Sequence, residues 1–214
     1  ELVQYALSRG IDTRLVNKRR RAYEGIERST GLRFCQEGYP EKELKTEFPM
    51  LRDLVWTQLP FAATGSRGGL RLTLADYKSM HTDVVTTILF IEDRRRRFPE
   101  MLICPRSDYS EYFFRERFSA YEFPQDKHFN TCFVVGGTDE TSIRTMITNE
   151  LIDYLKEDLF FCIAARENQV ALYREKEAIK KDRFRKTVNH SVDIYNCLAE
   201  SADHSPSPRT RHTG

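Results

Sequence analysis

The sequence lacks any apolar run that approaches the ~20 residues with which a helix crosses a bilayer. It also lacks the charged start and short apolar stretch of a secretory signal peptide. The first residue is Glu1 rather than methionine, so a membrane anchor before Glu1 is an alternative that this sequence does not test. We therefore expect a cytoplasmic protein, with tethering to a membrane through a segment that this chain does not contain as the alternative.

Metal-binding spacings are also missing. The five cysteines include no pair separated by two residues and no cluster with histidine, so we expect no metal site and no cofactor. Cys132, Cys162 and Cys197 each lie among apolar residues of an expected strand or helix. This placement is typical of small buried hydrophobic residues in a reducing compartment, and a disulfide framework is the less favoured alternative.

The net charge of +2 gives no reason to expect bulk affinity for nucleic acid. The charge is uneven, however, because residues 1–34 hold eight lysines and arginines against four acids, and a second basic block lies at residues 94–97. Guanidinium groups match phosphates and carboxylates well, so we predict an anionic membrane surface or an acidic protein as partner. The predicted binding residues are Lys18, Arg19, Arg20, Arg21, Arg94, Arg95, Arg96 and Arg97. Solvated surface charge is the main alternative, and nucleic-acid contact is a weaker one.

Residues 1–59 are expected to form a helical segment. Asp12 can cap a helix that Gly31 closes, and most of the cluster at residues 18–21 falls on the solvent side of this helix. Shorter helical stretches are expected at residues 2–8 and 48–56. The opposite face of the main helix carries, at helical spacing, Leu15, Val16, Arg19, Ala22, Tyr23 and Ile26.

For residues 60–200 we predict an α+β fold: a mixed, mostly antiparallel sheet of about five or six strands, with helices packed on one side. Alternating or β-branched residues indicate the strands, which are expected at residues 70–75, 82–91, 101–104, 129–135, 159–164 and 170–173. A glycine-rich turn precedes the first strand, and the last two form a hairpin. Helices are expected at residues 108–118, from Asp139 to residue 155, and at residues 177–199. Residues 201–214 have the composition of a disordered tail.

No spacing of residues specifies a reaction. The glycine-rich turn at residues 65–69 leads into a strand rather than a helix, so a strand-leading turn is favoured over a phosphate-binding loop. His81 stands beside Asp83 in an expected hairpin turn, with Asp76 across the turn, as a general base and its orienting acid would. An enzyme with a site assembled from Asp76, His81 and His128 is therefore an alternative function, while a solvated turn histidine is the simpler interpretation.

Several short features occur in a particular order along the chain. They are Gly68-Gly69-Leu70 before a strand ending in Asp76-Tyr77, a threonine-rich second strand, Phe98-Pro99-Glu100-Met101-Leu102, Phe129-Asn130 with Phe133-Val134-Val135, Asp139, the helix end at Leu151 to Leu155, and Val170-Ala171-Leu172-Tyr173. In this order, residues 65–198 resemble an uncharacterised soluble α+β domain of bacterial membrane-associated proteins, a family of unknown function. This chain departs from the family in its basic amino-terminal helix and in containing no anchoring segment. The resemblance implies an intracellular domain held near a membrane and assigns no catalytic residues.

These observations together predict a non-enzymatic binding or scaffold domain that acts near the cytoplasmic face of a membrane.

Overall fold

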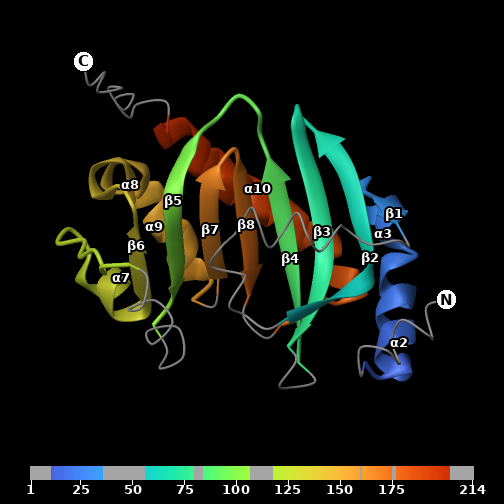
Figure 1. Cartoon of the computed structure of the whole chain (residues 1–214). Helices are drawn as coiled ribbons and strands as arrows, with labels where there is room; N and C mark the ends of the chain where they lie inside the picture. The colour runs from blue at the N-terminus through green and yellow to red at the C-terminus, as the bar shows by residue number, and fades with distance from the viewer. Residues whose placement is uncertain are drawn as a thin grey trace, which may run out of the picture.

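The computed structural model describes residues 11–35, 56–79, 84–106, 118–159, 161–174 and 177–202. Within these ranges the strands form one sheet in the order β1-β2-β3-β4-β8-β7-β5-β6 (Figure 1). The strands are β1 (Arg33–Cys35), β2 (Trp56–Arg67), β3 (Leu70–Ser79), β4 (Val85–Glu92), β5 (Phe98–Pro105), β6 (Phe133–Gly137), β7 (Phe161–Glu167) and β8 (Gln169–Arg174). Every pairing between these neighbours is antiparallel.

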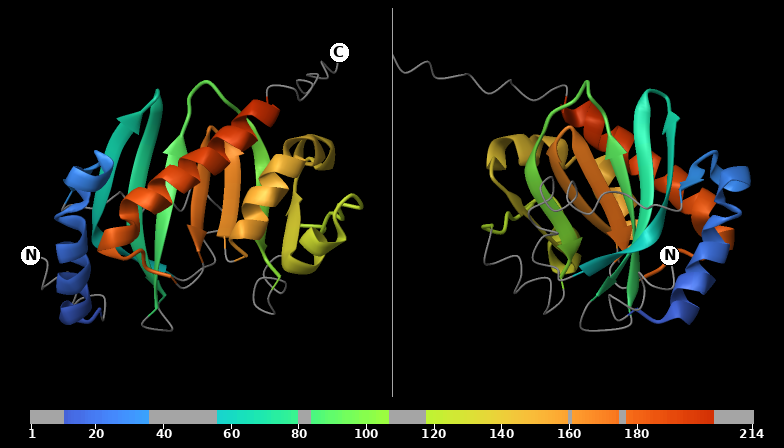
Figure 2. Two further views of the ribbon diagram at one scale, coloured as in Figure 1. Left: turned by 180° about the vertical axis from the view of Figure 1, so that it is seen from behind. Right: turned by 45° about the vertical axis from the view of Figure 1, so that its right-hand side comes forward.

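The described helices lie on one face of the sheet and at its two edges (Figure 2). They are α2 (Thr13–Tyr23), α3 (Ile26–Thr30), α7 (Lys127–Cys132), α8 (Glu140–Met146), α9 (Asn149–Glu157) and α10 (Phe184–Ala202), with a 3-10 turn, η1 (Lys181–Arg183), before the last. Helix α10 crosses the face diagonally beside α9, while α2 and α3 lie at the edge formed by β1 and β2. In the described part of the chain, no helix is long and apolar enough to span a membrane.

The predicted α+β class is confirmed, with two corrections. The sheet has eight strands rather than five or six, and its described pairings are all antiparallel rather than mixed. The two strands that the prediction missed are β1, which has only three residues, and β2, in which Pro60 and Gly65 weaken the strand signal. Trp56, expected at the end of a helical stretch, begins β2.

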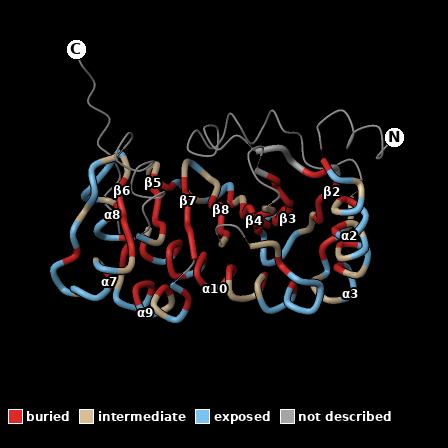
Figure 3. Tube along the Cα trace, turned by 90° about the horizontal axis from the view of Figure 1, so that it is seen from below, coloured by how far each residue is buried: buried red, intermediate tan, exposed pale blue. Residues whose placement is uncertain are grey.

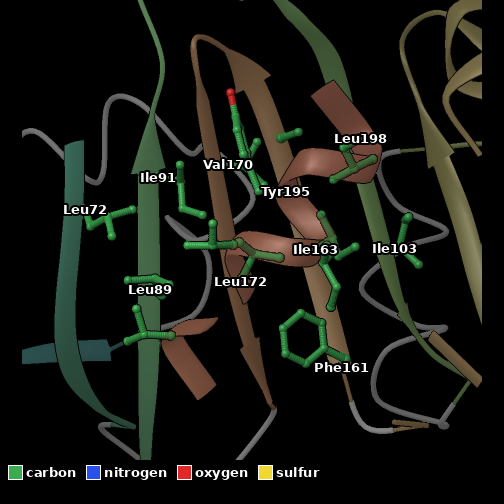
Figure 4. Close-up of a cluster of buried hydrophobic side chains, with 14 of the residues drawn as sticks. Leu72, Leu89, Ile91, Ile103, Phe161, Ile163, Val170, Leu172, Tyr195 and Leu198 are labelled. Carbon is green, nitrogen blue, oxygen red and sulfur yellow. The ribbon is translucent and has the colours of Figure 1, made fainter. Parts of the chain in front are cut away.

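The main core lies between the sheet and the helices (Figure 4). Alternate residues of the central strands, among them Leu89, Ile163 and Leu172, meet the buried side of α10, which includes Tyr195 and Leu198. Each such large side chain contributes about 1.5–3 kcal/mol to folding when it is fully buried. The apolar stripe of α10 and the apolar residues on the helix side of the central strands are therefore buried against each other.

The opposite face of the sheet is apolar as well and is also buried. It carries a second cluster with many small side chains, which includes Ala62, Ala75, Ala164, Ala171 and Cys162. In Figure 3 the central strands are accordingly mostly red, the colour of buried residues. In β4 every residue from Val85 to Ile91 is buried, which explains a sequence without clean polar–apolar alternation.

Residues 129–135 were predicted as one strand, and this prediction is wrong for residues 129–132. The structure has helix α7 followed by β6, because the Asp126 carboxylate caps the helix and accepts a hydrogen bond from the Phe129 backbone N–H at 2.8 Å. Phe129 then stacks on Phe133, with ring centroids 5.3 Å apart, from a helical position. The two rings therefore meet across a helix-to-strand junction rather than along one strand face.

The helix predicted from Asp139 to residue 155 is two helices, α8 and α9. Asp139 caps the first as expected, since its carboxylate accepts from Ser142 N–H at 3.1 Å. Thr148 caps the second, because its hydroxyl accepts from Leu151 N–H at 3.3 Å. A new helix therefore begins after Thr148, and α8 does not continue through it.

The hairpin of β7 and β8 is confirmed. The turn that precedes β3 consists of Gly68 and Gly69, both with positive φ (58° and 85°), as a tight hairpin turn requires. The last helix begins at Phe184 rather than near residue 177. Helix α10 extends to Ala202, so the first two residues of the tail predicted at residues 201–214 are helical. The helix expected at residues 2–8, residues 48–55 of the next short helix, residues 108–117 of the helix expected at residues 108–118, and the tail from residue 203 onward lie outside the described residues.

Candidate functional site

One of the predicted binding residues, Arg19, lies in the protein interior. It projects from α2 onto β3, where its Nε donates to Asp76 Oδ2 at 2.5 Å and its Nη2 donates to Asp76 Oδ1 at 3.2 Å. Its Nη1 donates to the carbonyl oxygen of Ile179 at 2.8 Å. The side chain of Arg19 is 8% exposed and that of Asp76 is fully buried, so this ion pair joins helix, sheet and the approach to α10 away from water.

Two hydroxyl groups complete the coordination of Asp76. Tyr23 donates to Asp76 Oδ1 at 3.1 Å, and Thr87 of β4 donates to the same oxygen at 2.5 Å. Burial favours the neutral form of Arg19, but the charge of Asp76 outweighs this effect and raises the pKa of Arg19. Burial raises the pKa of Tyr23 well above its ordinary value, and the negative charge of Asp76 raises it further. The cluster is thus a charged, hydrogen-bonded joint within the fold.

The second predicted basic block lies at the β4–β5 connection. Arg95 holds Asp93 through both a backbone and side-chain hydrogen bonds, with Nε 2.9 Å from Oδ1, and Tyr195 of α10 donates to Asp93 Oδ2 at 2.8 Å. The hydrogen bonds from Arg95 outweigh burial and lower the pKa of the Asp93 carboxyl below its ordinary range. This connection is therefore fastened to the carboxyl-terminal half of α10.

Two further arginines of this block are also engaged. Arg94 pairs with Glu92 at 3.2 Å, and Arg96 donates to the carbonyl oxygen of Ala199 at 3.0 Å, close to the end of α10. Arg97 is exposed. From Thr87, near the Arg19 pair, to Asp93 the strand rises about 20 Å. The two predicted basic clusters are therefore well separated and do not form one site.

Lys18 and Arg21 remain exposed on α2, and Arg14 lies on the same side one turn earlier. Arg20 pairs with Glu24 on its own helix at 3.0 Å. A second group of cations, which the sequence analysis did not single out, lies beside α2 at the start of α10. It consists of Lys180, Lys181, Arg183, Arg185 and Lys186, all exposed.

These two groups are neighbours in space. Lys181 lies against Gly25, so close that a Cβ there would stand 2.6 Å from Lys181 Cε. Figure 2 shows the start of α10 beside α2. We call the eight exposed cations the basic end surface; they are Arg14, Lys18, Arg21, Lys180, Lys181, Arg183, Arg185 and Lys186. The sequence analysis missed the cations at the start of α10, although five of the seven residues at positions 180–186 are basic.

A recess opens at the border of the basic end surface. It has a cavity volume of about 380 Å³ and lies on the helix side of the sheet, between the end of α9 and the start of α10. Phe161, Leu172 and Ile179 are its apolar lining, while Arg183 and Lys186 stand among its charged lining residues.

The alternative enzyme site is not assembled by the described residues. Asp76 lies on β3 and His128 on α7, next to β6, and five strand steps of ~4.8 Å separate these strands, or about 24 Å. His128 Nε2 lies 3.8 Å from Cys132 Sγ on an exposed helix turn. His81 lies outside the described residues.

Among the described cysteines and acids there is neither a disulfide nor a cluster with the makeup of a metal site. All five cysteines are free thiols. Burial raises the pKa of Cys197 to about 11, which disfavours its thiolate. Among the residues that the structure describes, no three or more histidine, cysteine or acidic side chains gather as metal ligands would.

Neither a protein-family model nor a curated protein matches this chain. Its fold is similar to that in the crystal structure of the mycobacterial trehalose monomycolate transport factor A, TtfA, with a TM-score of 0.59 and 12% sequence identity. The similarity covers 88% of this chain and 97% of that chain. At this identity the similarity shows the α+β fold alone. It extends over nearly the whole of the neighbour's chain.

Proposed function

We propose that this chain is a non-enzymatic binding domain that docks on an anionic membrane surface, at its cytoplasmic face, through the basic end surface. The shared fold supports this proposal, because the structural neighbour is named as a transport factor. A domain in such a role needs a recognition surface rather than a reactive cleft.

The observation that carries the proposal is the concentration of unpaired charge at one end of the molecule. Helix α2 contains no acid, and residues 180–186 contain one, Asp182. Eight exposed cations therefore face water with little local compensation. A lysine or arginine near an anionic membrane surface contributes about 1 kcal/mol to binding, so a surface of this size can hold a soluble domain at a bilayer.

The partners of each arginine favour this end over the β4–β5 connection. There, Arg94, Arg95 and Arg96 already pair with groups of the protein itself. Lipid phosphates would have to compete with these partners. On α2, the arginine that is committed to the fold, Arg19, points inward, while Lys18 and Arg21 point outward.

Vesicle co-sedimentation tests the proposal. The protein is expected to sediment with vesicles that contain phosphatidylserine and to stay in solution with pure phosphatidylcholine. Lys18→Gln/Arg21→Gln should weaken binding by about 2 kcal/mol, or roughly thirty-fold. The matched control Arg94→Gln/Arg97→Gln removes the same charge from the other cluster and should have little effect.

Equal sedimentation with neutral and anionic vesicles would contradict the membrane proposal. Binding to a polyglutamate peptide without binding to either vesicle would replace the membrane by an acidic protein as the partner.

A further inference from the structure

We propose that the recess between α9 and α10 binds one anionic amphiphile, with its charged head against α10 and its hydrocarbon chain on the floor of the recess. This inference rests on the proposed function, because the cations at the mouth of the recess belong to the basic end surface.

The floor of the recess suits a hydrocarbon chain. Phe161 and Leu172 project from neighbouring strands β7 and β8, and the third apolar lining residue, Ile179, accepts a hydrogen bond from Arg19 of α2 through its carbonyl oxygen. Figure 4 shows Phe161 at the end of the apolar cluster, beyond Ile163 and Leu172. The recess is therefore continuous with the main core, and a chain that enters it contacts apolar side chains already held in place.

The charges at the mouth fix the orientation of the ligand. Arg174 is engaged by Asp158 and also by Glu177, at 3.2 Å, so this part of the rim is balanced. Within the described residues, the side chains of Arg183 and Lys186 have no hydrogen bond or ion pair, and both line the recess. A negative head is thus attracted to the α10 side and repelled from the acids at the end of α9.

Helix α10 and the end of the 3-10 turn η1 before it present a polar stripe along this side. Residues 183, 187 and 190 follow helical spacing, so Arg183, Thr187 and His190 lie one above another toward the recess. The Thr187 hydroxyl can donate a hydrogen bond to an anionic oxygen. His190 packs its ring against Phe161, with centroids 5.6 Å apart, where the polar stripe meets the apolar floor.

The volume limits how much of a ligand enters. About 380 Å³ corresponds to roughly a dozen water molecules at ~30 Å³ each, within the usual range of small-ligand sites. A phosphate or carboxylate head with a short alkyl chain fits this space. The rest of a longer lipid would remain outside, at the basic end surface.

Titration calorimetry with three probes tests the ligand class: octyl phosphate below its micellar concentration, inorganic phosphate, and the neutral octyl glucoside. Octyl phosphate should bind at least roughly tenfold more tightly than inorganic phosphate, since burial of two CH₂ groups is sufficient for that difference. It should also bind more tightly than octyl glucoside, because only the phosphate head pairs with Arg183 and Lys186. Equal affinity for octyl phosphate and inorganic phosphate, or no binding of octyl phosphate, would overturn the inference.

Variants of the full chain locate the binding. Arg183→Gln/Lys186→Gln should weaken octyl phosphate binding at least roughly tenfold, since both side chains pair directly with the head. Thr187→Trp should abolish binding by filling the recess without changing the charge. Lys180→Gln/Arg185→Gln removes the same charge from residues that do not line the recess and should change affinity less than threefold, as screened surface charges do.

Equal losses in the two charge variants, or unchanged binding in Thr187→Trp, would overturn the inference, with circular dichroism confirming that each variant is folded. Thr187→Trp separates this inference from the proposed function, because it keeps every cation of the basic end surface. Vesicle docking without octyl phosphate binding refutes the recess alone. Octyl phosphate binding without vesicle docking refutes the membrane role alone.

Discussion

The protein builds two similar clusters at opposite ends of β4. In each, a buried aspartate accepts hydrogen bonds from one arginine and one tyrosine: Asp76 from Arg19 and Tyr23, and Asp93 from Arg95 and Tyr195. The arginines differ in origin and exposure. Arg19 reaches Asp76 across 57 positions with an 8% exposed side chain, whereas Arg95 lies two positions from Asp93 and is 67% exposed.

This difference indicates different tasks for the two clusters. A buried ion pair between distant segments fixes how α2 sits on the sheet, because either partner alone would be an uncompensated charge. A local pair with a solvated arginine costs little to break, since water replaces the protein partner. The Asp76 cluster thus fixes α2 on the sheet and leaves the cations on the outer side of α2 exposed. The Asp93 cluster holds the β4–β5 connection, and most arginines of that connection pair with groups of the protein.

The largest expected effect is the loss of Asp76. Asp76→Ala should lower the free energy of unfolding by about 3–5 kcal/mol, because Arg19 remains buried without its counter-charge. Urea denaturation measures this change. Arg19→Met/Asp76→Leu, which removes both charges, should recover most of the loss. A double variant no more stable than Asp76→Ala would show that the packing of the cluster, rather than the unpaired charge, is responsible.

A smaller loss is expected at the other end. Asp93→Ala should cost about 1–2 kcal/mol, since it removes hydrogen bonds from Tyr195 and Arg95 but leaves Arg95 in contact with water. The same urea titration measures it. If Asp93→Ala proved as destabilising as Asp76→Ala, exposure of the arginine would not distinguish the two clusters.

The stability that Asp93 provides should depend on pH. Its pKa in the folded protein is lowered, chiefly by hydrogen bonds from Arg95, so its contribution is fully present above the ordinary carboxyl pKa of about 4. The contribution is lost as the pH falls through the lowered folded value. In urea melts recorded from neutral to acid pH, the stability gap between the wild type and Asp93→Asn should narrow below about pH 4. A gap that widens on acidification contradicts the assignment.

The smallest effect is expected from Arg94→Gln/Arg97→Gln. Both side chains are exposed, and Arg94 pairs with Glu92 only at the surface. The change in unfolding free energy should stay within about 0.5 kcal/mol. A loss above that in urea denaturation would mean that this block supports the fold more than its exposure indicates.

The sequence allows prediction where the determining contacts are local. The cap at Asp139, the hairpin of β7 and β8 and the apolar stripe of α10 all follow from residues a few positions apart. Strand β2 was missed because Pro60 and Gly65 obscure it, and α7 because a side-chain cap at Asp126 overrides a β-like composition.

The sites depend on contacts between distant positions. Arg19 stood in an apolar stripe beside Val16 and Tyr23, which is a signal for a buried charge, but its partner 57 positions away could not be read from spacing. The recess combines residues of α9, β7, β8 and α10, which only the folded sheet brings together. The basic run at residues 180–186 was visible, but its position beside α2 was not.

The central claim is that the cations left free at the α2 end, and not those at the β4–β5 connection, contact the membrane. The most direct test compares the affinities of Lys18→Gln/Arg21→Gln and Arg94→Gln/Arg97→Gln for phosphatidylserine vesicles over a range of salt concentrations. We predict weak binding with a shallower salt dependence for the first variant and wild-type behaviour for the second. Identical affinities and salt slopes for the two variants would contradict the account.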